Sequence, residues 1–403
     1  MLHMTSPLTH CLPLDKLVDE FSALLLRLQD ASPDDPSVQS GHALRALLAH
    51  ALLHLDCSEQ WAGLVRRNLE DALAMRQANS SLYRSLPGVG FVIARLAGGV
   101  DLADLQESLD PMGRLLAQSV KAAPRVSLDL INGLAGLLVF ARAARQEELV
   151  DACWERLQTE LCLLTPHDAV AWDLGMAHGL PGVLSALAAL LQDGWSARGA
   201  RSLVAQSAQW LWSQCLPIAP DAVDFPYGSR HSPTDQPLRR SRHAWCYGAL
   251  GVSAAMVRLE HANLSDPAWT DATLRGALNA RQSHHGMVDQ CLCHGYAGSA
   301  YMCLRLAESL SPDSRPRLRA DLLAAAWEDH SKVVARLESE PCHATLHVTE
   351  GGKHRTDTLL EGSAGVLLAM AGMKHPELRA FEGLLLLDLP VVSSTGPETE
   401  RPE

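Results

Sequence analysis

The sequence predicts an all-α protein, and more specifically an α/α toroid, in which helix pairs repeat around a ring with one helix of each pair inside and one outside. Three observations favour this fold class. A Gly-x-x-Gly element recurs at intervals near 47 residues. The segments between its copies place apolar residues three and four positions apart, as amphipathic helices do. Each copy is followed by a more uniformly apolar run, which is typical of a helix covered on both sides.

The Gly-x-x-Gly element sets the length of the repeating unit. Its five intact copies lie at residues 133–136, 179–182, 248–251, 295–298 and 362–365. A degenerate sixth copy begins at Ser85, and from there the first positions are separated by 48, 46, 69, 47 and 67 residues. A unit of about 47 residues accommodates two helices. Two of the units therefore carry about 20 additional residues.

The remaining segments take their places around these copies. Outer helices are expected at residues 64–76, 102–120, 147–164, 200–215 and 318–338. A helix over 12–29 is expected to start or close the ring. The additional residues of the two long units, 216–240 and 339–357, are rich in proline, glycine or charge and are interpreted as loops. We expect a single toroid domain over residues 1–392 and a disordered tail over 393–403.

The composition argues against several classes of protein. Lys and Arg number 34 and Asp and Glu number 46, so the formal net charge is −12, which argues against a nucleic-acid-binding surface. No stretch reaches the roughly 18 apolar residues of a membrane helix. The first residues lack the basic start and apolar core of a secretory signal. We therefore expect a cytoplasmic protein with reduced cysteines and no nucleic-acid partner.

One position of the repeat is polar in every copy. The residues immediately before the first motif position are Arg84, Asn132, His178, Tyr247, His294 and Glu361. The flanking residues are mostly small and apolar. Residues at the same offset lie at the same height in a ring, so these side chains are expected to gather at one rim, near helix N-termini that favour anions. The sequence thus predicts a polar cavity mouth.

Two cysteines and a histidine belong to this rim. Cys246 and Cys293 share the next offset outward and are 47 residues apart, and His294 follows Cys293 directly. Two thiolates and an imidazole are typical zinc ligands, and three protein ligands leave one position open, as in catalytic zinc sites. The alternative is a pair of ordinary buried cysteines beside a histidine bonded to a carbonyl group.

Other cysteines and histidines are assigned structural or solvated roles. Cys291 is two residues from Cys293 and is interpreted as a packing residue. Five histidines lie in or beside the predicted loops and are expected to be solvated: His284, His285, His343, His347 and His354.

Five longer motifs stand in order along the chain. They are LDLINGLAG, MAHGLPG, RHAWCYG, CHGYAG and LEGSAG, which begin at Leu128, Met176, Arg242, Cys293 and Leu360. Together they resemble the motifs of the lanthionine synthetase C-like proteins, a family that includes the lantibiotic cyclases. The resemblance implies an α/α toroid, a zinc ion (Zn²⁺) held by Cys246, Cys293 and His294, and cyclisation of a dehydrated precursor peptide. It also implies a dehydratase and a membrane exporter as further partners.

The reaction implied is a Michael-type addition of a peptide cysteine thiol to dehydroalanine or dehydrobutyrine, which closes a thioether (lanthionine) ring. Metal binding would deliver the thiol as thiolate. His178 is the candidate acid for the enolate, and Asp129 is expected to orient or charge-stabilise an imidazole. Arg242 and Tyr247 are candidate donors to the enolate oxygen.

Each of these four residues has a structural alternative. His178 could be a core histidine with satisfied hydrogen bonds, and Asp129 could cap an inner helix. Arg242 could pair with an acidic neighbour such as Asp173, and Tyr247 could simply line the cavity.

Three other functions are consistent with the same residues. A zinc protein of this family could bind a thiol such as glutathione without cyclising a peptide. An α/α-toroid glycosidase would use two carboxylates, for example Asp129 and Glu361, and would need no metal. A non-catalytic scaffold would bind zinc without exchanging a thiol onto it.

Overall fold

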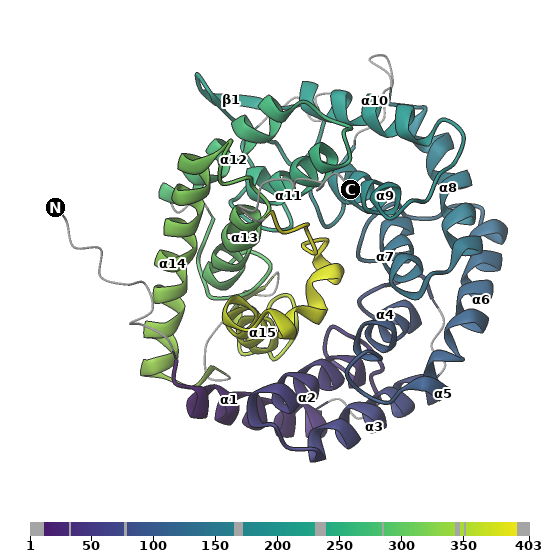
Figure 1. The fold of residues 1–403 in the computed structure, drawn as a ribbon, viewed down its shortest axis with the longest axis vertical. Helices are drawn as coiled ribbons and strands as arrows, with labels where there is room; N and C mark the ends of the chain where they lie inside the picture. Colours follow the sequence, from purple (N-terminus) through teal and green to yellow (C-terminus); the bar gives the residue numbers. More distant parts are fainter. Residues whose placement is uncertain are drawn as a thin grey trace, which may run out of the picture.

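Two concentric layers of α-helices form a closed ring (Figure 1). The computed structural model describes residues 12–31, 34–75, 79–164, 172–229, 239–283, 286–342, 347–349 and 352–392. This architecture is the predicted all-α toroid. The predicted tail over 393–403 lies outside the described residues.

Helices of the two layers alternate along the chain. The outer layer contains α1 (Leu14–Ala31), α3 (Gln60–Ala74), α5 (Ala103–Gln106), α6 (Leu109–Ala122), α8 (Glu147–Leu161), α10 (Ala200–Ser213), α12 (Pro267–Gln282) and α14 (Pro316–Ser339). The inner layer contains α2 (His42–Asp56), α4 (Leu86–Leu96), α7 (Leu134–Ala144), α9 (Leu180–Gln192), α11 (Gly248–His261), α13 (Tyr296–Glu308) and α15 (Ser363–Lys374).

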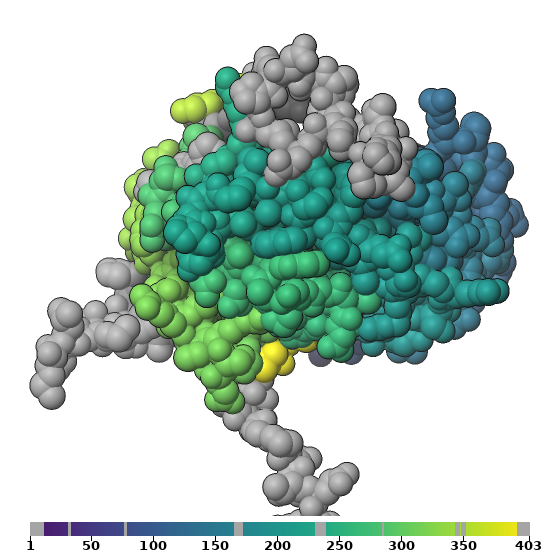
Figure 2. Space-filling view, turned by 90° about the horizontal axis from the view of Figure 1, so that it is seen from above, coloured from purple at the N-terminus to yellow at the C-terminus, as the bar shows by residue number. Residues whose placement is uncertain are grey.

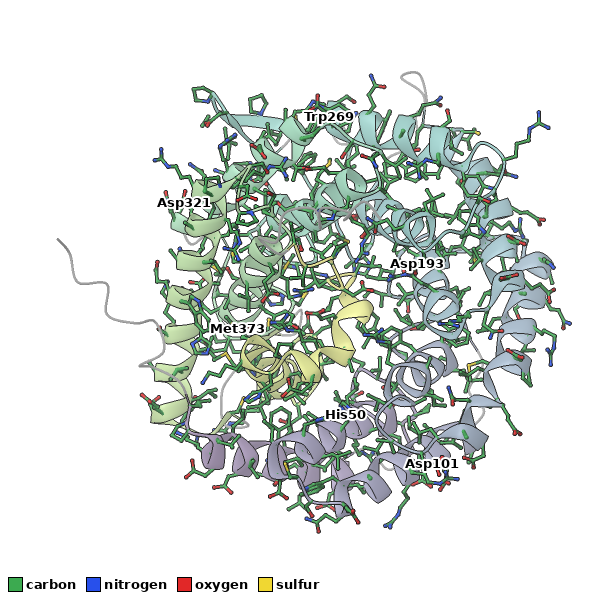
Figure 3. All side chains as sticks on the ribbon, viewed as in Figure 1. His50, Asp101, Asp193, Trp269, Asp321 and Met373 are labelled. Atoms are coloured by element: carbon green, nitrogen blue, oxygen red, sulfur yellow. The ribbon has the colours of Figure 1, made fainter. Side chains whose placement is uncertain are left out.

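Packing on both sides accounts for the apolar character of the inner helices. Each inner helix contacts the inner helix of the next repeat, and the contact of α15 with α2 closes the circle. In α9 every residue up to Leu191 is buried, whereas α10 buries one face only. Figure 3 shows the same division, with Met373 on an inner helix and Trp269 and Asp321 on outer ones.

The outer wall is continuous from one outer helix to the next. From the side, α10 and α12 lie between α8 and α14 (Figure 2). Among the described helices, none combines the length and the apolar composition needed to cross a bilayer.

The Gly-x-x-Gly element marks the start of an inner helix because the backbone approaches itself there. A Cβ atom on Gly136 would collide with the carbonyl oxygen of Leu130, six residues earlier, and the other intact copies repeat this collision. Only glycine fits without moving the backbone. Gly88 meets the Leu82 carbonyl in the same way. The degenerate copy that begins at Ser85 is therefore structurally equivalent to the others.

A seventh inner helix, α2, was not predicted. It follows Gly41, whose Cβ position is blocked by the backbone of Asp35, as in the other copies. Leu44 stands where those copies carry the second glycine, so a search for two glycines misses it. The outer helix α12 and the 3₁₀ helix η3 (Pro376–Leu385) were also not predicted.

Three predicted segments differ from the structure in detail. Residues 102–120 form two helices rather than one, because the ring of Pro111 is incompatible with a helical carbonyl four residues earlier. The segments 216–240 and 339–357 were interpreted as loops, but each contains an antiparallel hairpin. The hairpins are β1 (Leu216–Ala219) with β2 (Ala222–Asp224) and β3 (His347–Thr349) with β4 (Gly352–His354).

The C-terminal segment closes the middle of the ring. η3 follows α15 and turns towards the centre, where the chain is drawn in yellow in Figure 1. The carbonyl oxygens of Leu384 and Leu385 accept hydrogen bonds from Tyr83 Oη (2.7 Å) and Trp245 Nε1 (3.0 Å). These donors precede α4 and α11, which lie in different sectors of the ring. The segment is thus held as a floor by loops from both sides.

Candidate functional site

A closed circle of backbone hydrogen bonds joins the loops that precede the inner helices. Each loop donates an amide N–H to a carbonyl oxygen of the next loop. The bonds run from Gln39 to Tyr83 (3.0 Å), Leu82 to Ile131 (3.0 Å), Leu130 to Ala177 (3.0 Å), Ala177 to Cys246 (3.4 Å), Trp245 to Cys293 (2.9 Å), Cys293 to Leu360 (2.8 Å) and Leu359 to Gln39 (2.8 Å). Because the last bond returns to the first loop, the residues before the inner helices all lie on one rim.

A side-chain turn shapes five of these loops. Six residues before the first motif position, a side-chain oxygen accepts a hydrogen bond from the amide two residues further on. The acceptors are Asp35 Oδ1 (2.8 Å), Asn79 Oδ1 (2.8 Å), Ser127 Oγ (3.4 Å), Asp173 Oδ1 (2.7 Å) and Asp289 Oδ1 (2.9 Å). The recurrence of Asp, Asn or Ser at this offset is a sequence signal that precedes five of the inner helices.

The rim surrounds a cavity of about 600 Å³. All six residues of the polar offset line it: Arg84, Asn132, His178, Tyr247, His294 and Glu361. Arg242, Cys246 and Cys293 line it as well, and so do Tyr83 and Trp245, which hold the C-terminal segment. Tyr83 and Trp245 therefore connect the wall of the cavity to that segment.

Cys246, Cys293 and His294 bring three metal-ligating atoms together. Each residue offers one atom, and these atoms all lie within 4.8 Å of one another. All three residues are buried. Zinc binds sulfur at about 2.3 Å and imidazole nitrogen at about 2.0 Å, so donors at this spacing can share one ion. The donor set is soft to borderline, which fits Zn²⁺ and does not suit Mg²⁺ or Ca²⁺.

His294 belongs to a second group of the same spacing, with Asp289 and Cys291. Burial, together with the charge of Asp289, raises the pKa of the Cys291 thiol well above its usual range. The Cys291 sulfur accepts a hydrogen bond from the His294 amide (3.4 Å). Cys291 thus holds the backbone of the predicted ligand as a neutral thiol.

Cys246 and Cys293 differ in their protonation. The hydrogen bond from Cys293 lowers the pKa of Cys246 well below its usual range, and contacts with His294 and Arg242 lower it further. The same hydrogen bond and burial raise the pKa of Cys293. Cys246 is therefore the thiol of the pair that more readily carries a negative charge.

His178 and Asp129 form a hydrogen-bonded pair beside this charge. His178 Nδ1 lies 3.4 Å from Asp129 Oδ2, and this hydrogen bond raises the pKa of His178. Asp129 Oδ1 accepts from the Asn132 amide (2.6 Å). Asp129 therefore caps the turn at Asn132 and holds an imidazole, whereas the N-cap of α7 itself is Gly133. The His178 side chain is 45% exposed, which leaves it accessible from the cavity.

Tyr247 and Arg242 have different partners. Tyr247 Oη donates to Asp173 Oδ2 (2.7 Å), and burial and this bond raise the pKa of Tyr247. No ion pair of Arg242 with Asp173 is found in the described part of the chain. Burial lowers the pKa of Arg242, but the combined effect of Cys246, Cys293, Tyr227 and Cys291 raises it, and the net shift is upwards. Arg242 therefore faces the thiols.

Each of the two insertions, 216–240 and 339–357, brings one residue near the predicted metal ligands. These residues are Tyr227 and His347. Tyr227 follows β2, and its ring centroid lies 4.8 Å from that of Tyr247. Its carbonyl oxygen accepts from the Leu174 amide (2.9 Å), which anchors the insertion to the loop before α9. The Tyr227 side chain is exposed. Because the insertion was interpreted as a loop, no pattern in the sequence predicted the position of Tyr227.

The second insertion corrects a prediction about the histidines. His347 was expected to be solvated, but it is completely buried in β3. Burial lowers the pKa of His347, and Asp289 and His294 are among the charges that act on it. His354, on the paired strand β4, is exposed as expected. His284, His285 and His343 lie outside the described residues.

Comparisons with known proteins agree with this description. A family model described as "Lanthionine synthetase C-like protein" matches residues 32–386. Among solved structures, the chain is similar to one titled "Nisin cyclase", with a TM-score of 0.71 and 17% sequence identity. That match covers 92% of this chain and 97% of the other chain. No curated protein sequence gives a significant match.

Proposed function

The chain belongs to the lanthionine synthetase C-like family, and from this premise we propose that it is a zinc-dependent peptide cyclase. Its substrate would be a precursor peptide already dehydrated by a separate enzyme, and its product would leave the cytoplasm through a membrane exporter. The observation that carries the proposal is the convergence of Cys246, Cys293 and His294 within 4.8 Å in a cavity that also contains His178.

The donor set defines what the metal would contribute. A zinc ion held by these three residues would take a substrate thiol as a further ligand and would lower its pKa, so that the thiol would lose its proton to solvent and react as thiolate. The thiolate sulfur then adds to the β-carbon of dehydroalanine or dehydrobutyrine in the same peptide. A carbon–sulfur bond forms and the carbon–carbon π electrons move to the carbonyl oxygen, so that an enolate results.

We assign His178 the protonation step that completes the addition. Protonation of the enolate at the α-carbon replaces the proton lost by the thiol. The product then has the same mass as the substrate. His178 can be protonated near neutral pH because Asp129 raises its pKa, and it is accessible from the cavity. Asp129 Oδ2 accepts a hydrogen bond from His178 Nδ1 and so fixes the orientation of the ring. Nε2 is then the nitrogen that transfers the proton.

Arg242 is the better candidate for the enolate oxygen. Its guanidinium lies near the thiols and carries a permanent positive charge. The hydroxyl of Tyr247 is engaged by Asp173. We therefore assign Tyr247 the task of shaping the wall of the cavity.

Ring closure can be separated from addition of an external thiol. The protein would be incubated with a dehydrated peptide that contains a cysteine, with and without glutathione, and the products would be analysed by mass spectrometry and thiol alkylation. A cyclase consumes the peptide thiol at constant mass. A mass increase equal to glutathione, with the peptide thiol intact, would support the thiol-binding alternative instead.

The glycosidase alternative is not favoured by the geometry. It requires Asp129 and Glu361 to act as acid and base. Both oxygens of Asp129 already accept hydrogen bonds, one from the Asn132 amide and one from His178.

A further inference from the structure

We propose that Asp289 is a positioning residue for the metal ligand His294: its carboxylate holds the imidazole through Nε2 and so leaves Nδ1 for the ion. Asp289 Oδ2 lies 3.8 Å from His294 Nε2, and both side chains are at most 3% exposed. A carboxylate behind a ligating histidine fixes the orientation and tautomer of the ring and makes it a stronger ligand. The inference rests on the proposed zinc site.

The internal repeat shows that the loop is built to form this contact. Asp35 stands at the same offset as Asp289, and Ser40 stands at the same offset as His294. One oxygen of Asp35 caps its turn, and the other accepts a hydrogen bond from Ser40 Oγ (2.6 Å). Asp289 Oδ1 caps its turn in the same way, and Oδ2 faces the imidazole of His294 at ion-pair distance, where Asp35 meets a hydroxyl. The contact of Asp289 with His294 is therefore a property of the loop.

The turn itself does not need a negative charge. At the equivalent position, Asn79 caps its turn with an amide oxygen and Ser127 with a hydroxyl oxygen. The carboxylate of Asp289 is nonetheless buried, and a buried charge is costly unless it is compensated. His294 and the buried His347 are the histidines that interact with it electrostatically. The charge at this position thus acts on His294, while the turn accounts for one oxygen only.

The variant Asp289→Asn tests the inference because it keeps the turn and removes the charge. Zinc affinity would be measured by competition with a chromophoric chelator, on full-length protein that has been stripped of metal. We expect Asp289→Asn to bind zinc about 10 to 100 times more weakly than the wild type, the usual effect of losing such a partner. The matched control is Asp35→Asn, which makes the same change at the same offset beside a serine. It should bind zinc within about twofold of the wild type.

A second variant keeps the test decisive if the amide destabilises the loop. Asp289→Ser retains an oxygen for the turn, as Ser127 does in its own repeat, and should weaken zinc binding to a similar extent. In a His294→Ala background, Asp289→Asn should have no further effect on affinity, because it acts through that ring.

The outcomes separate this inference from the proposed function. Wild-type affinity in both Asp289 variants, or an equal loss in Asp35→Asn, would overturn the positioning role while the zinc site stands. A wild-type protein that binds no zinc would overturn the zinc site and the positioning role together.

Discussion

Two sides of the same rim carry different chemistry on equivalent backbone. On one side, the residue before the inner helix is His178, Tyr247 or His294, and each side chain lies against an aspartate: Asp129, Asp173 and Asp289. On the other side, the equivalent residues Arg84 and Asn132 are exposed. The turn that precedes Arg84 uses Asn79, and the turn that precedes Asn132 uses Ser127.

The difference between the two sides shows how equivalent backbone positions can present different side chains to one cavity. The circle of backbone hydrogen bonds brings all the rim positions to one level, regardless of their side chains. A carboxylate next to a rim position then decides whether an imidazole is oriented and more readily protonated. The two rim histidines therefore each lie against an aspartate, whereas the equivalent Asp35 meets the hydroxyl of Ser40.

The largest effect is expected from removing a thiolate on the metal side. Cys246→Ala should lose zinc and at least about a hundredfold in cyclisation rate, because the substrate thiol would no longer be delivered as thiolate. Metal content by elemental analysis and ring closure by mass spectrometry check this. Cys303→Ala, which alters a buried cysteine of α13 outside the cavity, is the control and should keep its zinc. Full activity in Cys246→Ala would contradict the account.

The next prediction compares equivalent rim positions on the two sides, His178 and Asn132. His178→Ala should lower kcat by about a hundredfold, the usual contribution of a general acid, with zinc content unchanged. Asn132→Ala, at the same offset on the other side, should lower it by no more than about threefold. Equal losses in the two variants would mean that the rim acts only by its shape.

The pairing of His178 with Asp129 should appear in the pH dependence of kcat. The acid must be protonated, so the rate falls as the pH rises through the pKa of His178. Asp129 raises that pKa, and Asp129→Asn should therefore move the fall in rate to lower pH. At neutral pH the loss should be on the order of tenfold, less than that of His178→Ala. A pH profile that does not move would show that another group supplies the proton.

The smallest effect is expected at Tyr247. Tyr247→Phe removes the hydrogen bond to Asp173, which should lower the free energy of unfolding by about 1 to 3 kcal/mol. Urea unfolding measures this change. Because the hydroxyl is already engaged, kcat should remain within about threefold of the wild type. A much larger fall in kcat would return Tyr247 to the role of enolate donor.

The fold could be predicted from the sequence because the second glycine of each copy has a strict physical cause. A residue with a Cβ atom at Gly136 or Gly182 would collide with a carbonyl oxygen. Glycine therefore recurs at this position and makes the repeat visible in the sequence. Where leucine stands in place of the second glycine, at Leu44, the same rule failed and α2 was missed. Register within the repeat then placed Cys246, Cys293 and His294 at one rim.

The rest of the site could not be predicted because it depends on contacts between elements without a periodic pattern. Tyr227 and His347 come from the two insertions, whose hairpins are too short to produce a recognisable alternation. The anchoring of the lining residues Tyr83 and Trp245 depends on Leu384 and Leu385 reaching the centre of the ring. The aspartates of the turns were visible in the sequence, but only the structure shows which side chain lies against their second oxygen.

The central claim is that Cys246, Cys293 and His294 hold one zinc ion with a position open to a substrate thiol. X-ray absorption at the zinc edge of the full-length protein tests it most directly, before and after addition of a dehydrated peptide that contains one cysteine. The account predicts two sulfur neighbours at about 2.3 Å in the free protein and three with the peptide. A sulfur count that stays the same when the peptide binds, or a protein that retains no zinc, would contradict it.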